Sequence, residues 1–140
     1  MTDVTREKRN NVVKLVAVAV VIRDGKVLVQ HRYRAAVGMV YEFPCGSVDD
    51  GENMEEAAIR ELREETGLLN CKHISTVHYS NQDGMQLGFV LLQGCDDEEP
   101  QITNPVRKQT FYWFKPDEIP VDEFLPTDRE FIRKNLIEHI

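Results

Sequence analysis

Residues 46–68 read GSVDDGENMEEAAIRELREETGL, and this stretch predicts a turn rich in glycine and aspartate followed by a helix. Asn53 is a favourable N-cap residue, and Glu56 three positions later completes a capping-box pair. Gly67 stands where a left-handed residue commonly ends a helix. Between these signals, apolar residues at helical spacing are expected to face the core: Ala57, Ala58, Ile59 and Leu62.

The second half of this expected helix concentrates negative charge. Glu61, Glu64 and Glu65 stand at i, i+3 and i+4, so their side chains share one helix face. Each like-charged pair at this spacing costs roughly 0.2–0.5 kcal/mol, and the helix dipole disfavours acids near the C-terminus. Arg60 can pair with Glu64 and relieve part of this repulsion. An acid-rich face is usually solvated surface, but a divalent cation bound by several carboxylates would remove the conflict.

The whole stretch has a fixed order: Gly, five residues, Glu, seven residues, then Arg-Glu-Leu-x-Glu-Glu-x-Gly-Leu. It matches, at every fixed position, the sequence box of the Nudix hydrolases, and the chain resembles their MutT-like branch. This resemblance implies an α/β/α sandwich with a mixed central sheet. It also implies Mg²⁺, with Mn²⁺ as a substitute, and the ligands would be Glu61, Glu64, Glu65 and the Cys45 carbonyl.

The same resemblance implies roles for other residues of the box. Glu61 or Glu64 would position or deprotonate the attacking water, and Arg60 would orient the glutamates. Glu52 would brace the turn against the helix, with Arg60 as its partner. Many relatives carry a glutamate a few residues before a tryptophan of a late strand, but here Gln109 stands near that place. This difference favours a glutamate of the box as the base.

The composition fits one soluble domain spanning residues 1–140. The net charge of −7 argues against a basic groove for nucleic acid, although bound metal ions would still allow small phosphorylated substrates. Three cysteines without a CxxC pair indicate neither a disulfide framework nor a zinc site, which favours a reducing cytoplasm. Residues 1–11 are polar and lack the apolar core of a signal peptide, and no apolar run is long enough to span a membrane.

Strands and turns surround the acidic helix. Asp24-Gly25 is a strong hairpin signal, and a C-terminal helix opens near Leu125, with Thr127 and Glu130 as an expected capping box. This order predicts a mixed sheet covered by helices on both faces. The expected strands are 12–22, 26–31, 71–80, 85–93 and 109–115.

Three further residues are candidates for substrate binding. Arg32, in a small basic cluster at a strand end, is either a phosphate clamp or a solvated arginine. Asp128 opens the C-terminal helix, where MutT-like enzymes place a base-reading residue, or it simply favours the helix dipole. As an acceptor it would suit an amino-bearing base such as cytosine or guanine. Phe89 either lines a base-binding cleft or packs in the core.

The sequence therefore predicts Mg²⁺-dependent hydrolysis of a nucleoside triphosphate to a monophosphate and pyrophosphate. The alternatives are a hydrolase of nucleoside diphosphate-sugars or ADP-ribose, an RNA cap-removing enzyme, and a module that binds nucleotides without hydrolysis. The last usually lacks acids of the box, all of which are present here. The expected partner is a small nucleotide, neither a membrane nor nucleic acid, and pairing of two copies into a homodimer stays open.

Overall fold

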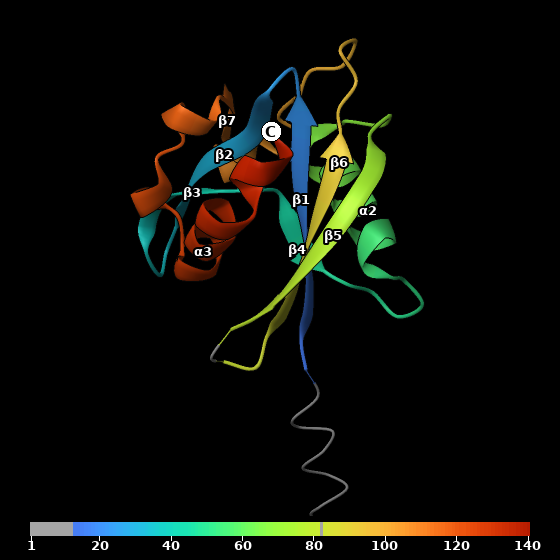
Figure 1. Ribbon diagram of the computed structural model, residues 1–140, viewed down its shortest axis with the longest axis vertical. Coiled ribbons are helices and arrows are strands. Elements are labelled where there is room, and N and C mark those ends of the chain that lie inside the picture. Colours follow the sequence, from blue (N-terminus) through green and yellow to red (C-terminus); the bar gives the residue numbers. More distant parts are fainter. Residues whose placement is uncertain (1–12, 82) are drawn as a thin grey trace, which may run out of the picture.

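Seven strands form one mixed sheet in residues 13–81 and 83–140, the part of the chain that this computed structural model describes (Figure 1). The main path through the sheet is β3-β2-β1-β6-β5, with β4 paired to β1 and β7 paired to β2. The β1–β6 pair is parallel and the other pairs are antiparallel, so the predicted mixed sheet is confirmed. The strands are β1 (Leu15–Arg23), β2 (Lys26–Arg34), β3 (Gly38–Glu42), β4 (Cys45–Ser47), β5 (Lys72–Ser80), β6 (Gln86–Gln93) and β7 (Thr110–Phe114).

Two α-helices lie on opposite faces of the sheet, α2 (Met54–Thr66) and α3 (Pro126–Lys134). Alternate residues of β1 point to the two faces, as the pleat of a strand requires. Ala17, Ala19 and Val21 pack with α2, whereas Val18, Val20 and Ile22 pack with α3. The predicted α/β/α sandwich is therefore confirmed. No helix in the described ranges has both the length and the apolar character needed to cross a bilayer.

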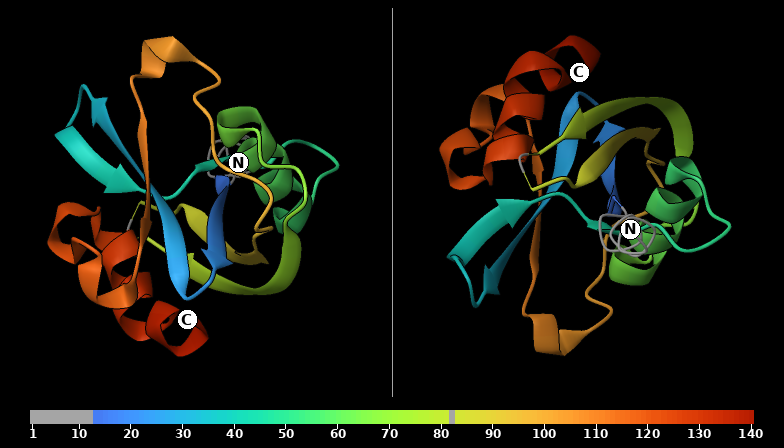
Figure 2. Two further views of the ribbon diagram at one scale, coloured as in Figure 1. Left: turned by 90° about the horizontal axis from the view of Figure 1, so that it is seen from above. Right: turned by 90° about the horizontal axis from the view of Figure 1, so that it is seen from below.

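Four short 3₁₀ turns complete the helical structure of the described residues. They are η1 (Pro105–Arg107), η2 (Pro116–Glu118), η3 (Val121–Glu123) and η4 (Leu136–His139). The connection from β6 to β7 carries η1 and runs from the α2 side of the sheet around to β7 (Figure 2).

The hairpin between β1 and β2 opens the sheet. Asp24 and Gly25 both have positive φ, 52° and 74°, as a type I′ turn requires. Beyond this turn the two strands pair at only two positions, Ile22–Val27 and Arg23–Lys26. β1 then pairs with β4 and β6, while β2 pairs with β3 and β7, and the two groups of strands diverge (Figure 2). A gap between two halves of one sheet can hold a ligand if side chains do not fill it.

Helix α2 has the ends that the sequence predicted. Asn53 accepts a hydrogen bond from the Glu56 N–H at 2.8 Å, and Glu56 accepts one from the Asn53 N–H at 3.0 Å. Gly67 is left-handed, with φ 79°, and its N–H donates to the Arg63 carbonyl at 2.9 Å. These local contacts fix where the acidic face of the helix begins and ends.

Other boundaries differ from the prediction. β1 begins at Leu15, and the expected strand start at Val12 lies outside the described residues, as does the polar segment 1–11. β2 continues to Arg34, three residues further than predicted, because it pairs along its second half with β3. Arg32 and Arg34 therefore belong to a paired strand and not to a loose strand end.

The predicted capping box of the C-terminal helix is wrong. Leu125 is the N-cap of α3, without a side-chain cap, and Pro126 occupies the first turn. Proline needs no partner for a backbone N–H and its fixed φ suits a helix start. Thr127 therefore already lies inside the first turn and cannot cap it.

Candidate active site

Arg60 of α2 is the centre of a hydrogen-bond network. Its Nε donates to Glu52 at 2.7 Å, and its Nη1 donates to Glu61 at 2.8 Å and to Glu64 at 3.1 Å. Its Nη2 donates to Glu52 at 3.0 Å and to the Ser47 carbonyl at 2.9 Å. These bonds raise the pKa of Arg60, chiefly through Glu52, and hold the pKa of Glu52 below its usual range. One guanidinium thus ties the turn after β4 to the acidic face of α2.

Gly46 allows this close approach between β4 and α2. A Cβ atom at this position would lie 2.1 Å from the Glu61 Cδ and 2.3 Å from its Oε1. Since van der Waals contacts cannot be that short, any larger residue would displace the Glu61 carboxylate. The first glycine of the box therefore leaves the space that the Glu61 carboxylate occupies.

Glu65 is the buried acid of the site. Its side chain is 5% exposed, and its Oε1 lies 3.2 Å from Nη1 of Arg107. Its Oε2 is buried and has no hydrogen-bond partner among the described residues. Burial, followed by the hydrogen bond with Glu61, raises the pKa of Glu65 to about 8, although the charge of Arg107 opposes this. A buried carboxylate oxygen without a partner is costly unless a ligand or ion satisfies it.

The three acids of α2 do not form a ready-made ion site in the described residues. In residues 13–81 and 83–140, no three Asp, Glu, His or Cys side chains are arranged to hold a metal ion. Arg60 pairs with Glu61 and Glu64, whereas Arg107 pairs with Glu65. The acids that the sequence grouped as ligands are thus paired here with arginines of the protein itself.

Two carbonyls of β4, those of Cys45 and Ser47, point away from β1. Ala19 donates to the Pro44 carbonyl and Val48 donates to the Leu15 carbonyl, which makes Val18–Cys45 and Val16–Ser47 the non-hydrogen-bonded pairs of the β1–β4 ladder. In such pairs the carbonyls face away from the partner strand, and that of Ser47 accepts from Arg60. The Cys45 carbonyl, two residues earlier, points to the same side.

The Cys45 thiol has a different character from its carbonyl. Burial raises the pKa of this thiol well above its usual range. A thiol needs the thiolate form to act as a nucleophile, and burial disfavours that form. The backbone oxygen of Cys45 is therefore its chemically useful group.

A cleft of about 640 Å³ opens where β1 and β2 diverge. Four of the residues singled out from the sequence line it, namely Arg32, Cys45, Glu61 and Asp128. Residues that sequence analysis did not single out also line it: Lys14, Val16, Val18, Arg34, Glu42, Phe43, Gly46, Ser47, Met85, Leu87, Arg107 and Leu125. The cleft therefore joins the acidic face of α2 to the start of α3.

A buried polar chain lies beside the cleft. Gln109 donates to Gln30 at 2.9 Å, and Gln30 donates to Glu42 at 2.8 Å. Glu42 also accepts two bonds of 2.8 Å from Arg34. Gln109 is 2% exposed. It stands near the place where many relatives carry a glutamate before a tryptophan, and here it belongs to this chain of hydrogen bonds. Glu42 belongs to the Glu-Phe-Pro run before the box, but only the tertiary structure shows that it binds Arg34.

Arg32 lines the cleft and has a buried hydrogen-bond donor that is not used. Its Nε is buried without a hydrogen-bond partner in the described residues. Burial and the charge of Arg34 lower its pKa. An arginine in this state would gain from a ligand with negative oxygens.

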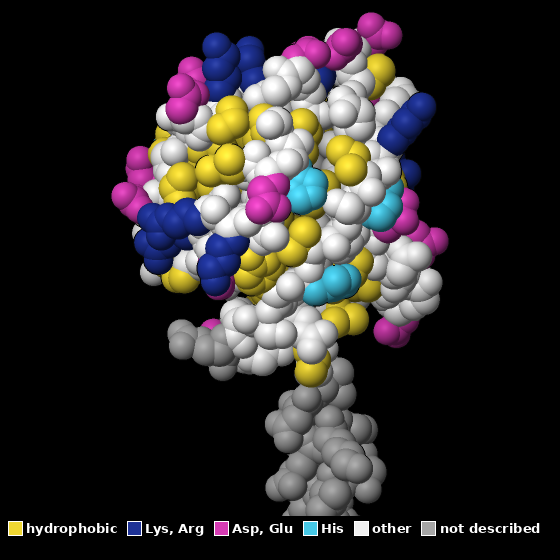
Figure 3. Space-filling model, in the orientation of Figure 1, with side chains coloured by type: hydrophobic (Ala, Val, Ile, Leu, Met, Phe, Trp, Pro, Cys, Tyr) yellow, Lys and Arg dark blue, Asp and Glu magenta, His cyan; other side chains and the backbone are white. Residues whose placement is uncertain are grey.

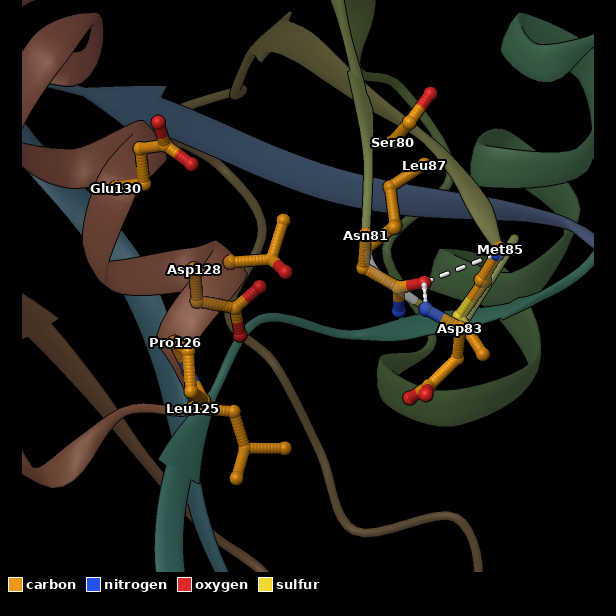
Figure 4. Close-up of a pocket in the computed structure, with 10 residues that line it drawn as sticks. Ser80, Asn81, Asp83, Met85, Leu87, Leu125, Pro126, Asp128 and Glu130 are labelled. Atoms are coloured by element: carbon orange, nitrogen blue, oxygen red, sulfur yellow. Dashed lines mark hydrogen bonds between the residues drawn. The ribbon is translucent and has the colours of Figure 1, made fainter.

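Asp128 lies in the first turn of α3, at the boundary between the cleft and a second pocket of about 530 Å³. Figure 4 shows Asp128 facing Asn81 across this second pocket. Burial and the charge of Glu42 raise the pKa of Asp128 to about 7. Its carboxyl group can therefore change between hydrogen-bond donor and acceptor near neutral pH.

Phe89 does not line the cleft. Its ring is 0% exposed and stacks on Phe131 of α3, with a centroid distance of 4.2 Å. The prediction that Phe89 binds substrate is therefore wrong, and the alternative of core packing is correct. Phe89 points to the α3 face of β6, where the core is continuous with the helix.

The comparisons with known proteins agree with this geometry. The Nudix domain family matches residues 13–135, and the chain belongs to that family. A MutT Nudix hydrolase from Burkholderia pseudomallei has a similar structure, with a TM-score of 0.66 and 25% identity, over 87% of this chain and 97% of that one. A Nudix hydrolase from Nitrosomonas europaea, with a TM-score of 0.71 but 18% identity over 87% of this chain and 71% of that one, shows the shared fold.

Relatives known by sequence vary in length. An RNA pyrophosphohydrolase of Novosphingobium aromaticivorans is 43% identical over 141 residues, covering 85% of this chain and 86% of that protein. An uncharacterized Nudix hydrolase of Schizosaccharomyces pombe is 36% identical over 110 residues, covering 75% of this chain and 54% of that protein. This chain thus spans about half the length of the yeast relative.

The burial of Glu65 predicts a pH dependence of stability. Because of this raised pKa, the Glu65 carboxyl keeps its proton up to about pH 8 in the folded state, whereas in the unfolded state it loses the proton near the ordinary pKa of 4.5. The contribution of this group to stability is therefore complete below about pH 4.5 and is lost as the pH rises toward 8. In chelator, urea denaturation of Glu65→Gln should show a smaller loss of unfolding free energy between pH 5 and 8 than the wild type.

Glu138→Gln is the control, because Glu138 is an exposed acid of η4, outside the site. Its pH profile should follow that of the wild type. Equal slopes for Glu65→Gln and wild type would contradict the assignment of Glu65 as the buried titrating acid.

Proposed function

We propose that this protein hydrolyses phosphoanhydride bonds with the help of Mg²⁺, and that its substrate is a nucleoside triphosphate cleaved to a monophosphate and pyrophosphate. The observation that carries the proposal is that Glu61, Arg32 and Asp128 all line one cleft. These residues suit, in that order, the reacting phosphates, the rest of the phosphate chain and the base. Membership of the Nudix family supports the same reaction.

Hard oxygen ligands for Mg²⁺ are available on α2 and β4, two elements that contribute residues to the cleft. They are the carboxylates of Glu61, Glu64 and Glu65 and the carbonyl of Cys45. The unpartnered Oε2 of Glu65 and the direction of the Cys45 carbonyl support this assignment. When bound, the ion supplies a water of lowered pKa and neutralises charge on the phosphates; Mn²⁺ is expected to substitute.

The protein's own groups then hold and move the proton. Glu61 or Glu64 takes the proton from the attacking water, and Glu61 is favoured because it lines the cleft, whereas the Glu64 side chain is 56% exposed. Arg60 keeps both acids in position, and Glu52 holds Arg60 through two bonds. Arg32 binds phosphate oxygens, and Asp128 accepts a bond from the amino group of a base.

A second substrate class is RNA carrying a 5′-triphosphate end. It is favoured by the relative from Novosphingobium aromaticivorans, an RNA pyrophosphohydrolase similar over most of both chains. The bond cleaved would be of the same kind. The net charge of −7 weighs against it, and the face seen in Figure 3 shows acidic and basic side chains interspersed. A cytoplasmic location, where free nucleotides occur, forms part of the proposal and suits the three free cysteines.

The deciding experiment is a substrate panel with both products identified. The protein with Mg²⁺ is incubated with nucleoside triphosphates, a 5′-triphosphorylated oligonucleotide, ADP-ribose and a nucleoside diphosphate-sugar. We expect the highest kcat/KM for a triphosphate, with monophosphate and pyrophosphate as products. Faster turnover of the oligonucleotide or of ADP-ribose would replace the proposed substrate, and tight binding with no turnover would indicate a nucleotide sensor.

Replacement of Glu64 tests the metal site. Glu64→Gln removes one negative ligand but little packing, because the side chain is largely exposed. We expect kcat/KM to fall by about 10²- to 10³-fold with an unchanged urea midpoint. Glu55→Gln, on the same helix but away from the cleft, is the control and should keep full activity. Full activity of Glu64→Gln would reject Glu64 as a ligand.

The pKa of Asp128 predicts a pH-dependent choice of base. A carboxyl group with a pKa of about 7 is mostly protonated at pH 6 and mostly ionised at pH 8. The ionised form accepts from the amino group of cytosine, and the protonated form donates to the carbonyl of uracil. The ratio of kcat/KM for cytidine over uridine triphosphate should rise up to about tenfold from pH 6 to pH 8.

A ratio of two substrates cancels any pH dependence of the common chemical step. In Asp128→Asn the same ratio should not change with pH, because the amide does not titrate. A wild-type ratio that is constant from pH 6 to pH 8 would exclude Asp128 as the residue that reads the base.

A further inference from the structure

Arg107 reaches the cleft from the connection between β6 and β7. It ends the η1 turn, which Asn104 caps by accepting from the Val106 N–H at 3.1 Å. Lys108 follows in the left-handed region, with φ 52°, and closes the turn. The Arg107 side chain is 35% exposed and lines the cleft together with Arg32 and Glu61. No feature of the box in the sequence predicts an arginine here.

The connection that carries Arg107 is attached to the acidic end of α2. The Gln101 N–H donates to the Thr66 carbonyl at 2.8 Å. The Thr103 hydroxyl donates to the carbonyls of Glu64 and Glu65, at 2.6 and 3.2 Å. These bonds satisfy carbonyls of the last helical turn, which have no partners within the helix. Arg107 is therefore held next to the proposed metal ligands by contacts that do not involve its own side chain.

The ion pair between Arg107 and Glu65 uses only one carboxylate oxygen. Nη1 of Arg107 lies 3.2 Å from Oε1, and Oε2 is left without a partner among the described residues. Arg34, by contrast, binds both oxygens of Glu42 at 2.8 Å. The geometry of the Arg34–Glu42 pair, with both carboxylate oxygens bound, is typical of a permanent arginine–carboxylate pair. The Arg107 pair has a weaker geometry and leaves an oxygen that a ligand can use.

We propose that Arg107 is an exchange residue, which pairs with Glu65 in the cation-free protein and binds a substrate phosphate once a divalent cation has taken the Glu65 carboxylate. The inference rests on the proposed function, because it requires the cation and the phosphates. A guanidinium and a divalent cation on one carboxylate repel each other, so the cation weakens the ion pair. Phosphate oxygens in the same cleft are the alternative partner for the released guanidinium, which binds phosphate well.

This exchange predicts opposite effects on cation and substrate. Without Arg107, a cation no longer competes with a positive side chain for Glu65, so binding should become tighter. The substrate, however, loses one charge-assisted contact. Isothermal titration of Arg107→Gln with Mn²⁺ should give a Kd roughly fivefold below that of the wild type.

Steady-state kinetics of the same variant should show KM for the triphosphate raised roughly tenfold, with kcat within about threefold of the wild type. Arg107→Lys keeps the competing charge, so its Mn²⁺ affinity should return to the wild-type value while KM stays raised. Lys108→Asn is the matched control, because it removes one positive charge from the same turn and asparagine tolerates the left-handed conformation. The Kd of this control for Mn²⁺ and its KM for the triphosphate should equal those of the wild type.

The outcomes separate this inference from the proposed function. If the wild type binds Mn²⁺ and hydrolyses the triphosphate but Arg107→Gln has unchanged Kd and KM, the exchange is wrong and the function stands. Weaker Mn²⁺ binding together with lower kcat and a lower urea midpoint would make Arg107 a structural residue and overturn the exchange. A wild-type protein that binds no cation and turns over no substrate would overturn both.

Discussion

The guanidinium of Arg60 is the interaction on which the arrangement of the site depends. It joins two glutamates of its own helix to Glu52 and to a carbonyl of β4. Three carboxylates around one point would repel one another and move apart. A single fixed cation with five donors brings them together and orients them, since each donor has a set direction. The space for this network comes from Gly46, where a side chain would collide with Glu61.

The sheet supplies the second requirement, a place for the ligand. β1 and β2 separate after two paired positions, and each strand continues in a different set of neighbours. The cleft occupies the resulting angle and is lined from both sides, by Val16 and Val18 of β1 and by Arg32 and Arg34 of β2. Because the strands themselves form the walls, the site has a rigid frame, and the variable parts are the loops that reach over it.

Several carboxylates of the site are paired with arginines of the protein. Arg34 pairs with Glu42, Arg60 pairs with Glu61 and Glu64, and Arg107 pairs with Glu65. This pairing explains why the acids do not already form an ion site. A cation and a polyphosphate that bind in this site would therefore have to replace existing ion pairs. Such an arrangement avoids the large cost of unpaired buried charges.

The sequence alone determined helix α2, its caps and the spacing of its acids, because capping and helical periodicity act over only a few residues. The fold class followed from the same stretch through its resemblance to a family. Only the tertiary structure decided that Phe89 faces α3, that β2 continues through Arg34, and that Arg107 meets Glu65. Each of these depends on which distant segments pack together, and no local pattern of residues encodes that choice.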